Sequence, residues 1–180
     1  SAAGNYTVVQ PTGLTANITP ASLTVTAIAD AKFVTLSDTA GYSGAAITGF
    51  VGSETSTVLG GSLAITRTNA SVNSASLTPY AGVLQPSGLT SSNYNIQFVA
   101  GDYQIVPAQT LIVKVANATV TYGGTATLVP TSVAYLESSN LLKSLTQTAA
   151  SGNTYTYSDG VGGSASFTLK ATGSTSTSSN

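Results

Sequence analysis

The first twenty residues of the chain resemble a passage near its middle. Each passage contains an Asn-Tyr pair followed by an Ile-x-Pro-Ala sequence, at 5–21 and again at 93–108. The offset is 88 residues at the Asn-Tyr pair and 87 at the Ile-x-Pro-Ala sequence. Each passage leads into a strand-like segment, at 23–26 and at 111–115. Self-similarity at a fixed period is typical of tandem arrays, so the fold has to be one that repeats along a chain.

The repeat divides the chain into three parts. Residues 1–20 are predicted to be the closing strands of a preceding repeat, 21–107 a complete module, and 108–180 the next module without its closing strand. A proline stands at each junction, where its fixed φ and missing N–H interrupt strand pairing. The Ser/Thr-rich end, 171–180, is typical of a flexible linker. Because the N-terminal passage is what the third part lacks, the sequence favours continuity between repeats, by covalent bond or by strand exchange.

Strand signals dominate the pattern of side chains. Leu23, Val25 and Ala27 alternate with threonines, which predicts a half-buried strand. The sequence predicts one hairpin at 94–105, turning at 100–102, and a second that joins 154–158 to 164–170. Serine and threonine compete with the helical backbone, so only about one helical turn is expected, near 52–59. We therefore predict a mainly β protein of tandem small sandwich-like (Ig-like) modules, with β-grasp-like modules containing one short helix as the alternative.

Composition excludes several function classes. Charged residues are 6% of the chain, against about 25% in an ordinary soluble domain. The five basic residues are scattered, whereas nucleic-acid binding needs a basic stripe. No apolar run reaches the roughly 18–20 residues that cross a membrane. We expect no nucleic-acid partner and no membrane insertion.

The sequence offers few groups for catalysis or for metal binding. It has no His and no Cys, which removes nucleophilic triads and zinc sites. Asp102 and Asp159 adjoin glycine and are expected in turns. A calcium site assembled at a module junction could use Asp30 or Asp38, although no Asp-x-Asp-x-Asp run is present. We expect no enzyme activity, no catalytic, metal or cofactor-binding residues, and no cofactor.

Two other roles were weighed for polar and aromatic side chains. Lys32 and Lys114 lie near predicted strands, where a Lys–Asn isopeptide cross-link would be possible, but their positions do not correspond between the repeats. The nine tyrosines could form a platform that stacks on glycans. Tyrosines in a mainly β chain more often belong to the core, or to a sheet face with the hydroxyl near the surface.

Several short motifs resemble those of the MBG and YDG repeat domains. The closing passage at 91–96 with 101–108 resembles their closing motif, and 4–8 with 10–15 resembles its YDG variant. Residues 49–55 are similar to an internal Gly-Phe-Val-x-Gly-Glu-Thr element, with Ser53 in place of Gly. The Thr-Tyr-Gly-Gly sequence at 121–124 resembles a repeat opening. The complete module departs from the family at 31–34, where Tyr-Asp-Gly or Tyr-Gly is usual.

The resemblance implies a structural role in a large bacterial surface protein. Repeats of this kind occur in filamentous-haemagglutinin-like exoproteins secreted by the two-partner route. We therefore expect a stalk or fibre segment of an extracellular, cell-surface adhesin, active in adhesion and biofilm, in which modules stack end to end. The alternatives are a module that binds a host or matrix glycan or protein, and a filament subunit that donates its N-terminal strand. Neighbouring copies of the repeat are the expected partners.

Overall fold

The computed structural model describes residues 13, 19–116, 118, 124 and 126–171, which form short β-strands and one 3-10 helix. The predicted mainly β architecture is confirmed. The predicted closing strands at 1–20, the opening motif at 121–124 and the Ser/Thr-rich end lie almost entirely outside the described residues. In chain order the elements are β1 (Ala21–Ala27), β2 (Asp30–Phe33), β3 (Ala45–Thr48), η2 (Ser56–Val58), β4 (Gly60–Arg67), β5 (Tyr80–Thr90), β6 (Tyr94–Val99), β7 (Gly101–Val106), β8 (Leu111–Val115), β9 (Pro130–Leu136), β10 (Leu142–Ser144), β11 (Thr146–Ser151), β12 (Thr154–Ser158) and β13 (Ser164–Thr168).

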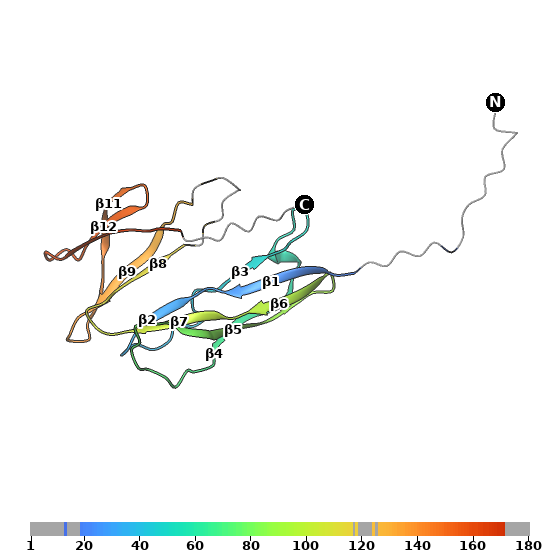
Figure 1. The fold of residues 1–180 in the computed structure, drawn as a ribbon, viewed down its shortest axis with the longest axis horizontal. Helices are drawn as coiled ribbons and strands as arrows, with labels where there is room; N and C mark the ends of the chain where they lie inside the picture. The colour runs from blue at the N-terminus through green and yellow to red at the C-terminus, as the bar shows by residue number, and fades with distance from the viewer. Residues whose placement is uncertain (1–12, 14–18, 117, 119–123, 125, 172–180) are drawn as a thin grey trace, which may run out of the picture.

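The first seven strands form two small sheets, one of three strands and one of four. The sheet orders are β3-β1-β6 and β2-β7-β5-β4. The chain runs directly from β1 into β2 and from β6 into β7, so each of these paths passes from one sheet to the other (Figure 1). Strand β5 packs across β1 and β6 without pairing with them, as in a sandwich. The core between the sheets contains Ala27, Ile65, Leu84, Tyr103 and Ile105.

The first two strands of this unit run parallel to its last two. Strand β1 pairs with β6 over six residue pairs, beginning at Ala21 and Tyr94. Strand β2 pairs with β7 over four residue pairs, ending at Phe33 and Val106. The chain therefore enters the unit at one end of its long axis and leaves it at the other (Figure 1). Parallel pairing of the terminal strands and a short helical segment between them are features of the β-grasp alternative. In this unit the helical segment is a 3-10 turn between β3 and β4.

The hairpin predicted at 94–105 is wrong. Strands β6 and β7 do not pair with each other, and each lies parallel to a different segment near the N-terminus. The Ala-Gly-Asp sequence at 100–102 indicated a turn, but Gly101 has another role. A Cβ on Gly101 would lie 2.4 Å from the carbonyl oxygen of Ala27, so only glycine lets the two backbones approach where the path changes sheet.

Three other local predictions agree with the structure. Leu23, Val25 and Ala27 are all buried, on the inner face of β1. The expected helical turn is the 3-10 helix η2. The hairpin predicted near the C-terminal end is the antiparallel pair β12–β13, and its first strand buries Tyr155 and Tyr157 on one face.

The last six strands form a second pair of three-stranded sheets, in the orders β10-β9-β8 and β11-β12-β13. Between them lies a core of Val133, Tyr155 and Tyr157, with Phe167 stacked on Tyr157 at a ring-centroid distance of 5.8 Å. The agreement with sandwich-like modules thus extends to this unit. Within the described part of the chain, no helix has the length and apolar character needed to cross a membrane.

The second unit does not continue straight from the first. After β7 the chain turns at 107–110, where Gln109 has a positive φ of 64°. Strand β8 then runs back beside β2, with Ile112 packed near Phe33 and the Lys114 side chain at Asp30. The arrangement differs from the expected end-to-end stacking, because the second unit packs against the side of the first at its outgoing end (Figure 1).

Candidate functional site

A buried cluster of charges lies at one side of the first unit, around the carboxylate of Asp38. Arg67, at the end of β4, donates from Nε to Oδ2 at 2.8 Å and from Nη2 to Oδ1 at 3.2 Å. Lys32 on β2 places its Nζ 2.9 Å from Oδ1. The hydroxyls of Tyr42 and Tyr103 also donate to this carboxylate, at 3.0 and 3.2 Å. One carboxylate therefore accepts hydrogen bonds from four side chains.

The electrostatics of the cluster keep Asp38 ionised. Partial burial pushes the pKa of Asp38 upward, but hydrogen bonds from Arg67, Lys32 and Tyr42 outweigh this and lower it to about 2. Burial also raises the pKa of the Tyr103 hydroxyl, and the negative charges of Asp38 and Asp30 add to that shift. A permanent carboxylate among cations and neutral phenols is not poised to exchange protons near neutral pH.

The remaining donors of Arg67 hold the loop between β4 and β5. Its Nη1 donates to the carbonyl oxygens of Asn69 and Val72 at 2.9 and 3.1 Å, and its Nη2 to that of Ala70 at 3.1 Å. The guanidinium also lies over the Tyr103 ring, 4.9 Å from its centroid. Among the described residues, no buried side-chain nitrogen or oxygen lacks a hydrogen-bond partner. Each charged side chain of the cluster is bound to partners within the same chain, so the cluster stabilises the fold.

The cluster contains the residue types of an isopeptide cross-link. Lys32 Nζ donates to Asn73 Oδ1 at 2.6 Å, and Asp38 is beside it. However, Asn73 is exposed, and Arg67 holds Asp38 as an anion that pairs with Lys32. A catalytic carboxyl group would have to donate a proton to the amide, and a carboxyl group held ionised has none to donate. We interpret the contact as an ion-pair network.

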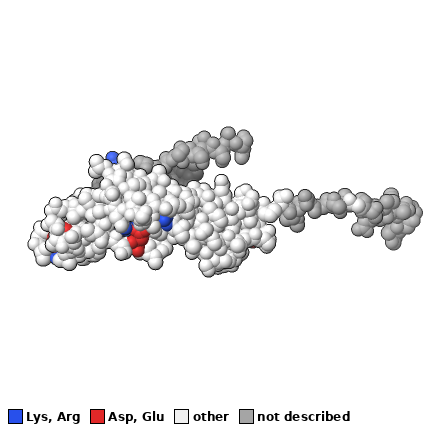
Figure 2. All heavy atoms as spheres, turned by 90° about the horizontal axis from the view of Figure 1, so that it is seen from below, with Lys and Arg blue, Asp and Glu red and all other residues white. Residues whose placement is uncertain are grey.

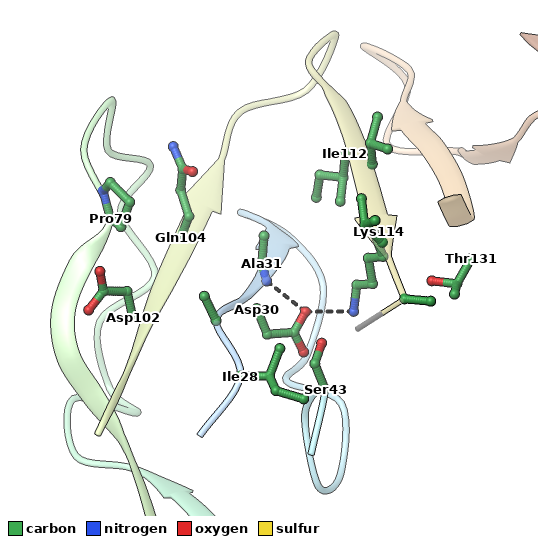
Figure 3. Close-up of a pocket in the computed structure, with 14 residues that line it drawn as sticks. Ile28, Asp30, Ala31, Ser43, Pro79, Asp102, Gln104, Ile112, Lys114 and Thr131 are labelled. Carbon is green, nitrogen blue, oxygen red and sulfur yellow. Dashed lines mark hydrogen bonds and ion pairs between the residues drawn. The ribbon is translucent and has the colours of Figure 1, made fainter. Parts of the chain in front are cut away.

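A second polar site lies at the junction of the two units. Lys114 Nζ on β8 lies 2.7 Å from Asp30 Oδ1, and the Asp30 side chain is only 2% exposed (Figure 3). Asp30 also accepts from the backbone N–H of Ala31 at 2.7 Å. Beside this pair, Phe33, Val106 and Leu136 form a small apolar core that joins the units. The junction is therefore built from both apolar packing and a buried ion pair.

A cleft of about 600 Å³ lies between the units at this junction. Residues 28–31 line one side and 112–116 the other, and Asp102 and Gln104 are also among the lining residues (Figure 3). The one buried carboxylate in the cleft is Asp30, and Lys114 already neutralises it. No cluster of three metal-ligating side chains is present in the described residues. The calcium site considered for Asp30 and Asp38 is not formed, because protein cations occupy both carboxylates.

The two acidic residues assigned to turns have different positions. Asp159 does lie in a turn, and its Oδ1 accepts from the N–H groups of Val161 and Gly163 at 2.9 and 2.8 Å. These bonds, the one from Val161 foremost, lower the pKa of Asp159. Asp102 is on β7, where it accepts from the N–H of Gly82 at 2.9 Å, so its assignment to a turn was wrong.

The tyrosines that the structure describes do not form an exposed platform. Four of the seven within the described ranges are buried and the other three are partly buried. Tyr94 shows how they are used: its ring packs edge-on against Phe50, and its hydroxyl accepts from Val51 N at 2.9 Å and donates to Glu54. These contacts bind the segment 49–55, which resembles the family's internal Gly-Phe-Val-x-Gly-Glu-Thr element, to β6.

The fold and its sites define an all-β repeat module in which charged side chains stabilise loops and junctions. Residues 23–104 match the sequence profile of the family described as the MBG domain (YGX type). The predicted resemblance is confirmed over these residues, which match the MBG domain family. This family is found in adhesin-like surface proteins. No curated protein and no solved structure matches the chain.

Proposed function

We propose that the chain is a load-bearing stalk segment of an extracellular bacterial adhesin, at the cell surface and without catalytic activity. The family match supports a place in a surface protein. The segment would hold a binding region away from the cell and transmit tension between them. Its partners are then neighbouring repeats, and adhesion and biofilm formation are properties of the whole adhesin.

The parallel pairing of β1 with β6 and of β2 with β7 is the observation that carries this proposal. Tension enters the first unit at Ala21 and leaves at Val106, which lie at opposite ends of the parallel pairs. Pulling on these ends slides β1 against β6 and β2 against β7. All ten residue pairs share the load and have to fail together, whereas strands peeled from one end lose their hydrogen bonds one at a time. This geometry resists extension.

The surface is consistent with a spacer. The face shown in Figure 2 carries few charged side chains, and most of it is neutral. The cations of the described region that are buried or half-buried pair with acids of the same chain. A surface of threonine, serine and glycine without a charge stripe gives little steering toward charged ligands. The alternative of a glycan-binding module is less well supported, because the described tyrosines are buried or partly buried.

Small-angle X-ray scattering of concatemers tests whether the segment is a stiff spacer. Chains with one, two and three copies of residues 1–180 are compared. A stalk predicts that the maximum dimension rises by an equal increment for each copy. Growth with about the square root of copy number, the behaviour of a flexible chain, would contradict the proposal. Concatemers with Gly/Ser linkers between copies are the matched control. A specific, saturable hit on a glycan array would favour the binding module instead.

A further inference from the structure

We propose that the open edge of β8 binds the N-terminal closing passage, residues 5–19, of a second copy of this chain as an added parallel strand. The inference extends the stalk function to assembly between chains. Four observations carry it: the equivalence of β8 with β1, the exposure of β8, the cleft beside it, and the sequence of the passage.

Strands β8 and β9 repeat the arrangement of β1 and β3. In the first unit Val25 on β1 pairs antiparallel with Ile47 on β3. In the second unit Val113, 88 residues after Val25, pairs antiparallel with Val133 on β9. The other side of β1 is covered by β6 in parallel. Within the described residues, β8 is the edge strand of its sheet and pairs with β9 alone.

Among the described residues, β8 is less well covered than β1. Leu23 and Val25 on β1 are 0% exposed, because β6 and the facing sheet enclose them. Their equivalents Leu111 and Val113 are only half-buried. An edge strand with apolar residues and unpaired backbone groups is a template for strand addition.

The cleft at the junction gives an incoming strand room along this edge. Successive residues of a strand point to opposite faces of its sheet. The cleft is lined by all five residues of 112–116 and all four of 28–31 (Figure 3). Because consecutive residues line it, the cleft runs along the edges of these two segments and not over one face of either. Strand β2 is likewise the edge of its sheet.

The passage at 5–19 carries the sequence of the strand that covers β1. Its Asn-Tyr pair, and the Ile-x-Pro sequence that ends just after it at Pro20, match those of the β6–β7 path at 93–107. The register of β1 on β6 places Ser22 opposite Asn95 and Leu23 opposite Ile96. Transferred by 88 residues, it places Thr110 opposite Thr7 and Leu111 opposite Val8. Main-chain pairing then supplies affinity, and alternate side chains supply specificity.

Site-specific cross-linking tests the partner and the register together. The chain has no cysteine, so single substitutions introduce the only thiols. Thr7→Cys and Thr110→Cys chains are mixed and treated with a short bismaleimide. The proposal predicts a heterodimer joined at these positions, at a yield at least tenfold above a mixture of Thr7→Cys with Thr146→Cys, which lies on the exposed strand β11. Equal yields in the two mixtures would overturn it.

Two further measurements keep the outcome unambiguous. In a dilute Thr7→Cys/Thr110→Cys double variant, a cross-link confined to one chain would overturn the proposal, because the passage would then cover its own β8. By sedimentation, the unmodified chain should gain mass with concentration, and Val8→Pro should reduce that association at least tenfold while Ala3→Pro does not. A chain that stays monomeric throughout also overturns the proposal. These failures would leave the scattering test of the stalk unaffected.

Discussion

At the scale of single residues, the fold depends on a few charges that are used internally. Asp38 and Arg67 connect strand ends to loops far apart in sequence, with the Arg67 side chain 0% exposed. Removing one partner of a buried pair leaves an uncompensated charge, which costs more than the pair contributes. In a chain with so few charged residues, each of these contacts should be visible in stability measurements.

We predict that Asp38→Asn destabilises the chain at neutral pH and removes part of its acid sensitivity. The pKa of Asp38 is lowered from 3.8 to about 2 in the fold, so the ionised form contributes about 2 kcal/mol that is fully present above pH 3.8. That contribution is lost as the pH falls through about 2. Denaturant unfolding at several pH values measures it. A variant with the same pH dependence as the parent would contradict the assignment.

A second residue-scale prediction concerns Lys32 and Asn73. Since Asp38 is held ionised beside Lys32, the pair should stay non-covalent. The intact mass of the purified chain should equal the mass of its sequence. The loss of one ammonia, absent from a Lys32→Met variant, would show that an isopeptide bond forms.

The sequence drew attention to some of these residues but could not pair them. Asp30 and Asp38 were considered as ligands for a cation, and the structure supplies lysine and arginine as the cations. The partners lie 29 residues away for Asp38 with Arg67 and 84 for Asp30 with Lys114. No local spacing encodes such contacts. The overlooked signal is that buried strands such as β2 carry charged side chains only where a partner is available.

At the scale of elements, the alternation of apolar and polar residues predicted which strand faces are buried. It did not predict which strands are neighbours. The face of Leu23 and Val25 and the hairpin β12–β13 follow from local pattern and turn residues. The path β6–β7 does not, because a glycine in a strand is compatible with both a turn and a close backbone contact. The parallel pairing with β1 and β2 depends on segments about 70 residues away, which no local signal reports.

Gly101→Ala should test the crossing between sheets. Its Cβ would be 2.4 Å from Ala27 O, so we expect a loss of about 3 kcal/mol from forced backbone shifts. Gly52→Ala is the comparison, because its φ of 62° is strained but nothing lies within 4 Å, and it should cost about 1 kcal/mol. Tyrosine fluorescence during urea unfolding measures both. A cost at Gly101 no larger than at Gly52 would contradict the close approach.

At the scale of the whole molecule, the two units are coupled through one junction. Lys114→Met should cost about 2 kcal/mol, because it leaves the carboxylate of Asp30 buried with a single backbone donor. The double variant Asp30→Asn/Lys114→Met should recover part of this loss, which identifies the charge as the cause. A double-mutant cycle by denaturant unfolding gives the coupling energy. Additive effects of the two substitutions would show that the pair does not couple the units.

The resistance of the first unit to tension is the central claim, and force spectroscopy tests it most directly. Handles are attached at Pro20→Cys and Pro107→Cys, so that the load shears the parallel strands. The comparison uses Pro20→Cys with Asn93→Cys, which lie at the same end of β1 and β6 and peel them apart. In the shear geometry we predict a single unfolding event that releases roughly 300 Å of extended chain. The force of this event should be at least twice the force needed for peeling. Equal or lower force in the shear geometry would contradict the account.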